Sequence, residues 1–117
     1  MLAHTDVPNY AAAIREVARV LRPGGRFVHV GLHPCFTGAF ADWSEPSRIV
    51  IDAGYARRDR AFVGPPHGVR VRVGAWHVPL ADLLNAFTEA GLSIDRVAES
   101  AATGIADIFG VRATKPR

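Results

Sequence analysis

The first third of the chain has an apolar pattern that predicts a helix, a sharp turn and a buried strand. The apolar positions of the helix recur at spacings of three and four and form one stripe: Tyr10, Ala13, Ile14, Val17 and Leu21. We expect Asp6 to be the N-cap and Pro8 to lie in the first turn, where a missing N–H costs little. The stripe predicts a helix that packs on a sheet.

The helix is followed by Pro23-Gly24-Gly25 and then by a short apolar run. Proline cannot continue a helix and glycine can take positive φ values, so these residues predict a tight turn. The strand expected over Arg26 to Gly31 contains Phe27-Val28 and Val30, a run typical of a strand covered on both faces. A charge at Val28 is therefore expected to destabilise the chain by several kcal/mol.

The middle of the chain has the least regular pattern. Residues 37–68 contain Pro46, Pro65, Pro66 and several glycines, but apolar and aromatic residues recur through them, so they are not a linker. This mixture predicts an irregular cap or lid over a site. Val69 to Val73 alternates strictly between apolar and polar residues, which predicts a short half-exposed strand.

The last third predicts a second helix and a β-hairpin. The apolar face of the helix consists of Leu80, Leu83, Leu84 and Phe87, and Gly91 is expected at its C′ position. Residues 92–99 predict a strand, residues 100–104 a turn of small residues, and residues 105–113 a final strand interrupted by Gly110. Two strands so close in sequence are expected to pair in antiparallel fashion.

Length and composition limit the class of protein. The 117 residues are enough for one domain, and 49% of them are hydrophobic. No apolar run approaches the roughly 18 residues that cross a bilayer, and the first residues do not resemble a signal peptide. The single cysteine, Cys35, fits a reducing compartment. We therefore expect a cytoplasmic protein that does not contact membranes.

The basic balance of the chain raises the question of nucleic-acid binding. The net charge is +3 and the basic residues are mostly dispersed arginines, with one cluster at Arg57, Arg58 and Arg60. No nucleic-acid motif or interleaved aromatic residues accompany them, so solvated surface arginine is the preferred interpretation. A missing acidic half of the domain would also explain the imbalance.

The segment Glu16 to Gly25, with the sequence EVARVLRPGG, carries a family resemblance. It resembles the E-x-x-R-V-L-x-P-G-G signature of class I S-adenosylmethionine-dependent methyltransferases, in which this helix and turn lead into the fifth strand. The resemblance implies an α/β fold: the C-terminal half of a Rossmann-like methyltransferase sheet, with a terminal antiparallel hairpin whose last strand lies beside the fifth. Residues 1–117 would be a partial methyltransferase domain.

The same resemblance implies S-adenosylmethionine as cofactor and indicates which segments would bind it. The family's glycine-rich loop and its acidic residue after the second strand have no counterpart in this sequence, and we expect both to lie upstream of Met1. His4 would lie near the methionine end of the cofactor. Alternatively, His4 is a loop histidine bonded to backbone.

Two further histidines are candidate catalytic residues. His33 follows the buried strand, where ligands bind in open α/β sheets, and a histidine there could deprotonate a hydroxyl. Alternatively, His33 orders the loop and Cys35 packs as a small apolar residue. His77 could position a substrate or cap the second helix. His29 and His33 lack further ligands at suitable spacing, so no metal site is expected.

Aromatic residues near these histidines are candidates for an apolar substrate wall. They are Phe36, Phe40, Trp43 and Trp76, although Trp76 could equally cover the end of the sheet. Such a wall favours a small-molecule methyl acceptor over a nucleic acid. The predicted function is therefore methyl transfer to a small molecule, and the alternative is a non-catalytic remnant or assembly module of the same fold. An unpaired sheet edge predicts self-association of the chain alone.

Overall fold

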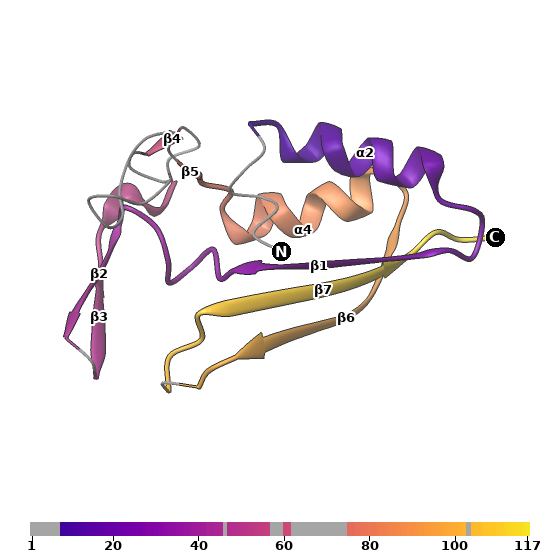
Figure 1. Ribbon diagram of the computed structural model, residues 1–117. Helices are drawn as coiled ribbons and strands as arrows, with labels where there is room; N and C mark the ends of the chain where they lie inside the picture. The colour runs from indigo at the N-terminus through magenta and orange to yellow at the C-terminus, as the bar shows by residue number, and fades with distance from the viewer. Residues whose placement is uncertain (1–7, 46, 57–59, 62–74, 103) are drawn as a thin grey trace.

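The computed structural model describes residues 8–45, 47–56, 60–61, 75–102 and 104–117. Two helices lie on one face of a three-stranded antiparallel sheet with the order β1-β7-β6 (Figure 1). The elements of this unit are α2 (Tyr10–Val20), β1 (Arg26–Leu32), α4 (Leu80–Glu89), β6 (Ser93–Ser100) and β7 (Ile108–Thr114). The chain is thus a mixed α/β unit, as the sequence predicts.

Helix α2 begins at Tyr10, and its N-cap is Asn9. The Asn9 side-chain oxygen accepts a hydrogen bond from the Ala12 N–H at 3.0 Å, which satisfies one of the free donors of the first turn. The prediction that Asp6 is the N-cap is wrong, because Asn9 occupies that position. Asp6 itself lies outside the described residues. Pro8 precedes the helix instead of lying in its first turn.

The turn after α2 leads directly into β1, as predicted. Gly24 takes a φ of 82°, and its N–H donates to the Lys115 carbonyl at 2.7 Å. The Lys115 N–H in turn donates to the Gly25 carbonyl at 2.8 Å, so the end of β7 fixes the turn. β1 then runs through the predicted strand and one residue beyond Gly31.

The terminal hairpin is confirmed. β6 pairs with β7 in antiparallel fashion, and β7 also pairs with β1. β7 begins at Ile108, three residues later than predicted. Gly110 does not interrupt it, because this glycine pairs with Val30 on one side and Ala98 on the other.

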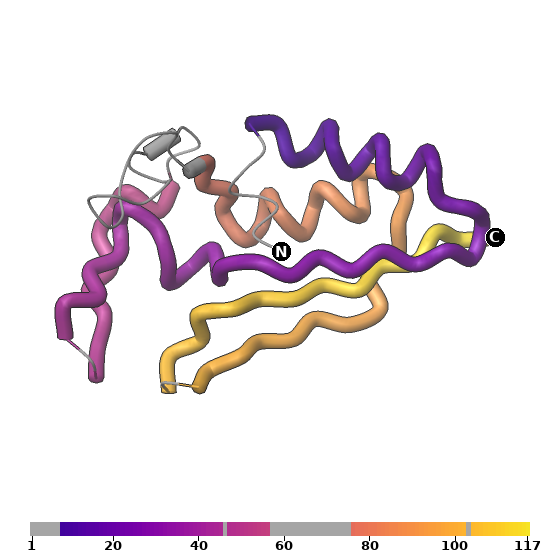
Figure 2. Tube along the Cα trace, viewed as in Figure 1, coloured from indigo at the N-terminus to yellow at the C-terminus, as the bar shows by residue number. Residues whose placement is uncertain are grey.

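The prediction that β1 is buried on both faces is wrong. His29 is buried, whereas Val28 is 59% exposed and Val30 is 37% exposed. Successive side chains of a strand point to opposite faces, and both helices cover the same face. The Cα trace in Figure 2 shows the other face of the sheet without a covering layer in the described part of the chain.

Helix α4 ends as the glycine signal predicts. Gly91 has a φ of 86°, and the N–H of Leu92 donates to the Phe87 carbonyl at 3.0 Å, which completes a Schellman motif. The core lies between the two helices and the covered face of the sheet. Its buried residues are Tyr10, Ile14, Ala18, Leu83, Ala86, Phe87, Leu92, Phe109, Val111 and Ala113.

The cap segment is more regular than predicted. A β-hairpin of β2 (Ala41–Glu45) and β3 (Arg48–Ile51) projects from the body (Figure 1). A 3-10 turn, η1 (Ala53–Ala56), follows, and β4 (Arg60–Ala61) pairs with β5 (Ala75–Trp76). The strand predicted over Val69 to Val73 lies outside the described residues.

Candidate functional site

Three parts of the chain meet at the edge of the unit where β1 ends. The loop after β1, the first turns of both helices and the turn η1 all lie toward this side (Figure 1). A groove of about 200 Å³ opens between the starts of the two helices. It is lined by Pro8, Asn9, Tyr10, Ala11, His77, Val78, Pro79 and Asp82. In open α/β sheets, ligands bind beyond the carboxyl ends of the strands, so this edge is the candidate site.

His33 is the first residue after β1 and is 2% exposed. Its Nδ1 accepts a hydrogen bond from the Cys35 N–H at 3.2 Å. Its Nε2 lies 2.5 Å from Oε2 of Glu99 at the end of β6. Because Nδ1 accepts, the ring proton resides on Nε2 and is donated to the carboxylate. Both ring nitrogens are thus occupied by contacts within the protein.

The backbone of His33 holds the loop that follows. Its N–H donates to the Asp107 carbonyl at 2.8 Å, and its own carbonyl accepts from the Thr37 hydroxyl at 2.7 Å and from the Thr37 N–H at 3.1 Å. The Phe36 ring packs on the imidazole with a centroid distance of 4.7 Å. His33 therefore links the exit of β1 to the β6–β7 hairpin and orients Phe36.

A second cluster joins the cap to the start of α4. The N–H of Leu80 donates to the Tyr55 hydroxyl at 2.8 Å, and Nε2 of His77 donates to the Tyr55 carbonyl at 2.6 Å. The N-cap residue of helix α4, Pro79, makes no side-chain cap bond. The Tyr55 hydroxyl therefore accepts one of the free N–H groups at the start of this helix. His77 holds the backbone of Tyr55, and the interpretation of His77 itself as the helix cap stays a prediction. Burial raises the pKa of Tyr55, which keeps its hydroxyl protonated.

The structure gathers most of the predicted substrate wall. Phe40 is 4% exposed and packs on Tyr55 and His77, with centroid distances of 5.5 and 4.9 Å. The Trp43 indole N–H donates to the Phe36 carbonyl at 2.6 Å. Phe36, Phe40 and Trp43 thus belong to one segment, attached on one side to His33 and on the other to His77. Trp76 is the last residue of β5 and directly precedes His77. His4 lies outside the described residues.

Three residues that hold this edge make long-range contacts that the sequence alone does not predict. Glu99 and Tyr55 contact their histidine partners across 66 and 22 positions of sequence. The third is Tyr10, whose hydroxyl lies 2.6 Å from Nδ1 of buried His29. Burial lowers the pKa of His29 to about 4 and raises that of Tyr10, so the tyrosine donates to a neutral imidazole.

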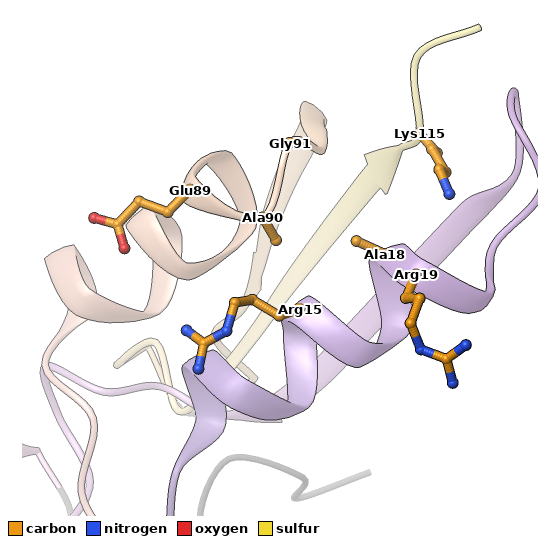
Figure 3. Close-up of a pocket in the computed structure, with 7 residues that line it drawn as sticks. All are labelled: Arg15, Ala18, Arg19, Glu89, Ala90, Gly91 and Lys115. Atoms are coloured by element: carbon orange, nitrogen blue, oxygen red, sulfur yellow. The ribbon is translucent and has the colours of Figure 1, made fainter.

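A larger groove of about 380 Å³ lies at the opposite end of the unit (Figure 3). It is lined by Arg15, Ala18, Arg19, Glu89, Ala90, Gly91 and Lys115. These residues surround the ends of both helices and the residue after β7, which lies beside the start of β1. Since this is not the carboxyl end of β1, we do not place the site there.

Solved structures that match the fold include two methyltransferases. A presumed S-adenosylmethionine-dependent methyltransferase from Listeria monocytogenes is 17% identical, with a TM-score of 0.79 over 99% of this chain and 59% of its own. An S-adenosylmethionine-dependent methyltransferase from Mesorhizobium loti is 25% identical, with a TM-score of 0.73 over 97% of this chain and 58% of its own. The fold is that of S-adenosylmethionine-dependent methyltransferases. The chain spans less than two thirds of either structure.

No protein-family model matches the sequence, and no curated protein matches it either. The resemblance recognised in the segment from Glu16 to Gly25 is therefore confirmed through structure alone. In the described part of the chain, no helix is long and apolar enough to span a membrane. Nor do three His, Cys, Asp or Glu side chains among these residues gather into a group that could hold a metal.

The groove at the candidate edge does not by itself form a cradle for S-adenosylmethionine. The groove at the candidate edge measures about 200 Å³, whereas pockets that enclose cofactor-sized ligands measure roughly 300–1,000 Å³. Its lining offers the side chains of Asn9, His77 and Asp82 as polar groups, but His77 already donates to Tyr55. We therefore derive no chemical step through the cofactor from these residues.

Proposed function

We propose that this chain is the acceptor-binding part of an S-adenosylmethionine-dependent methyltransferase that acts on a small, partly apolar molecule in the cytoplasm. The observation that carries the proposal is the match of nearly the whole chain to two structures of this fold. The aromatic segment from Phe36 to Trp43 at the end of β1 supports a small acceptor. This segment contains three aromatic residues and no Lys or Arg that would contact a nucleic-acid backbone.

In this proposal the chain contributes position more than reactive groups. S-adenosylmethionine supplies an electrophilic methyl group when the complete site binds it. Phe36, Phe40 and Trp43 would exclude water from the acceptor and hold its apolar part, with Trp76 as a further wall. Holding two reactants in reactive geometry accounts for much of the rate enhancement in such transfers.

His33 and His77 remain the proposed residues for proton transfer from the acceptor. Their contacts support a positioning contribution as well, because His33 donates to Glu99 and His77 donates to Tyr55. To serve as a base, His33 would have to exchange the Cys35 N–H at Nδ1 for the acceptor, whereas the contact between His77 and Tyr55 engages Nε2. His4 is proposed to contact the methionine end of the cofactor.

The test is methyl transfer by the protein purified at its natural length from its source. We expect labelled methyl groups to pass from S-adenosylmethionine to members of a panel of small hydroxyl, amine and thiol compounds, and not to RNA or DNA. In that protein, His33→Gln or His77→Gln should lower kcat by about 10²- to 10⁴-fold if the residue transfers the proton, with cofactor affinity nearly unchanged. Transfer to nucleic acid only, or no transfer at all, would contradict the proposal.

The second candidate is a non-catalytic assembly module of the same fold. The exposed apolar side chains of β1 favour it, because such a surface is suited to contact another polypeptide. A natural-length protein that binds no S-adenosylmethionine but forms a defined complex would support this candidate over the enzyme.

A further inference from the structure

The hairpin of β2 and β3 exposes apolar side chains on its second strand. Figure 1 shows the hairpin as an arm that is separate from the three-stranded sheet. Val50 is 55% exposed and Ile51 is 42% exposed, although both belong to a strand. A two-stranded hairpin by itself is at best marginally stable in water. The arm would therefore be stabilised by pairing with a further strand.

The outer edge of β3 has backbone groups that can form this pairing. β3 pairs with β2, and no other strand among the described residues pairs with it. The Asp52 N–H donates to the Phe40 carbonyl at 2.9 Å, so the backbone groups of Asp52 point toward the segment of β2. Along an antiparallel strand, these groups alternate between the two edges. The N–H and C=O groups of Ile49 and Ile51 therefore point to the outer edge.

The sequence along this edge is complementary to its own reverse. It reads Arg48-Ile49-Val50-Ile51-Asp52. When two copies pair in antiparallel fashion about Val50, Ile49 of one copy lies opposite Ile51 of the other. Arg48 of each copy then lies opposite Asp52 of the other, so the contact holds two apolar pairs and two pairs of opposite charge. In this register the ladder hydrogen bonds come from Ile49 and Ile51, whose backbone groups point outward.

The contacts of the two charged residues within their own chain leave them available. Arg48 lies 3.0 Å from a carboxylate oxygen of Glu45, but both side chains are more than half exposed, so this ion pair is weak. One carboxylate oxygen of Asp52 accepts the Gly54 N–H at 2.7 Å, and its second oxygen can accept from an arginine. Both residues can thus contact a second copy without losing these bonds.

The edge of β2 is less suited to such pairing. β2 carries Asp42 and Glu45 and no Lys or Arg, so two copies of it would bring like charges together. A register shift also interrupts β2 between these two residues. Irregularities and charges of one sign are features that protect an edge from pairing. β3 has no proline, and its only charge is Arg48 at one end.

We propose that the outer edge of β3 is the contact surface for a second copy of this chain, with a two-fold axis at Val50. The two hairpins then form one four-stranded antiparallel sheet. Such a short pairing gives a small interface, so we expect a weak dimer that forms as the concentration rises. The pairing also holds the cap segment, since Phe40 directly precedes β2 and its carbonyl is bonded to Asp52. This inference does not depend on the proposed function.

Disulfide formation at the axis tests the pairing in the full chain. The two copies of Val50 would face one another at a non-hydrogen-bonded position, where Cα atoms lie about 4.5 Å apart, within the range of a disulfide. With Cys35→Ser in the background, we expect Val50→Cys to form a covalent dimer at least about tenfold faster than Asp42→Cys. Asp42 is the matched control because it pairs with Val50 on β2, so its two copies would lie about 14 Å apart.

Exchange of the charged residues tests the register. Arg48→Asp and Asp52→Arg each place like charges opposite one another in a homodimer, so each should weaken the dimer at least about tenfold. A mixture of the two variants restores both pairs of opposite charge and should dimerise as the parent does. Sedimentation velocity measures this with Val28→Glu in every chain, which removes association through the exposed face of β1.

Hydrogen exchange gives a third measurement and, with circular dichroism, establishes that each variant is folded. The amides of Ile49 and Ile51 should gain protection as the concentration rises, whereas the amide of Val50, which faces β2, should not. Equal oxidation rates for Val50→Cys and Asp42→Cys would overturn the proposal. A mixture of the charge variants that associates no more than either variant alone would also overturn it.

Discussion

The contact between His33 and Glu99 is the best-defined polar feature of the candidate edge, and its two partners differ in environment. The His33 side chain is 3% exposed, whereas that of Glu99 is 53% exposed. Removing the carboxylate would leave a buried N–H without its acceptor, which costs more than the contact gains. We expect Glu99→Ala to lower the free energy of unfolding by about 1–2 kcal/mol, since water can reach part of the site.

Glu99→Gln is the matched control for this variant. Its amide oxygen still accepts the Nε2 proton of His33, so most of the stability should be retained. Urea unfolding of the three proteins gives the comparison. Equal stability of the alanine variant and the parent would show that the contact does not hold the loop.

The buried pair of Tyr10 and His29 makes the stability of the fold depend on pH. Burial lowers the pKa of His29 from 6.5 to about 4, so the unfolded chain binds a proton in this interval that the folded chain does not. The free energy of unfolding therefore keeps its full value above pH 6.5 and decreases as the pH falls from 6.5 toward 4. The loss amounts to up to about 3 kcal/mol.

Urea unfolding at several pH values between 4 and 7 measures this dependence. His29→Phe keeps a ring in the core but removes the titration, so its slope with pH should be smaller than that of the parent. Its absolute stability should fall because Tyr10 loses an acceptor. Parallel slopes would mean that His29 titrates normally in the folded chain.

At the level of elements, β1 is covered on one side only, and this changes what a substitution in it does. Val28 is 59% exposed, whereas Val111, which pairs with His29 on the covered face, is 1% exposed. In this chain alone, Val28→Asp should cost no more than about 1 kcal/mol, mainly through poor strand propensity. Val111→Asp should prevent folding, because it places a charge in the core.

Thermal unfolding of both variants decides between the two interpretations of β1. A large loss of stability for Val28→Asp would restore the original prediction and would require a layer over the open face. The measurement is made at low protein concentration, so that contacts between molecules do not protect the strand.

At the level of the whole molecule, the sequence predicted what local signals determine. Gly24 and Gly91 take positive φ values that few other residues allow, and the turn after α2 and the end of α4 were predicted correctly. Asn9 and Asp6 are both good N-caps, so the pattern could not distinguish them. The burial of Val28 and Val30 depends on which elements pack on that face of β1, and the sequence of the strand does not determine this.

In the candidate site, too, the residues with a local sequence signal were predicted and those that depend on long-range contacts were not. The sequence identified Phe36, Phe40 and His33 because they follow an apolar strand that ends at a ligand-binding edge. It could not identify Glu99, since a contact across 66 positions depends on how the hairpin folds back on β1. Long-range pairs of this kind leave no periodic pattern in the sequence.

The last prediction concerns the chain expressed alone. We expect it to bind S-adenosylmethionine weakly or not at all, because the groove at the candidate edge is about 200 Å³ and the family's glycine-rich loop is not in this sequence. We also expect it to self-associate, because no strand among the described residues pairs with the outer edge of β1, and Val28 and Val30 beside that edge are exposed. Sedimentation velocity over a range of concentrations and calorimetric titration with the cofactor test the two parts. Val28→Glu should shift the sedimentation profile toward smaller species. A stable monomer that binds the cofactor with a Kd of about 1 μM, equivalent to roughly −8 kcal/mol, would show that this chain forms a complete cofactor site without any further polypeptide.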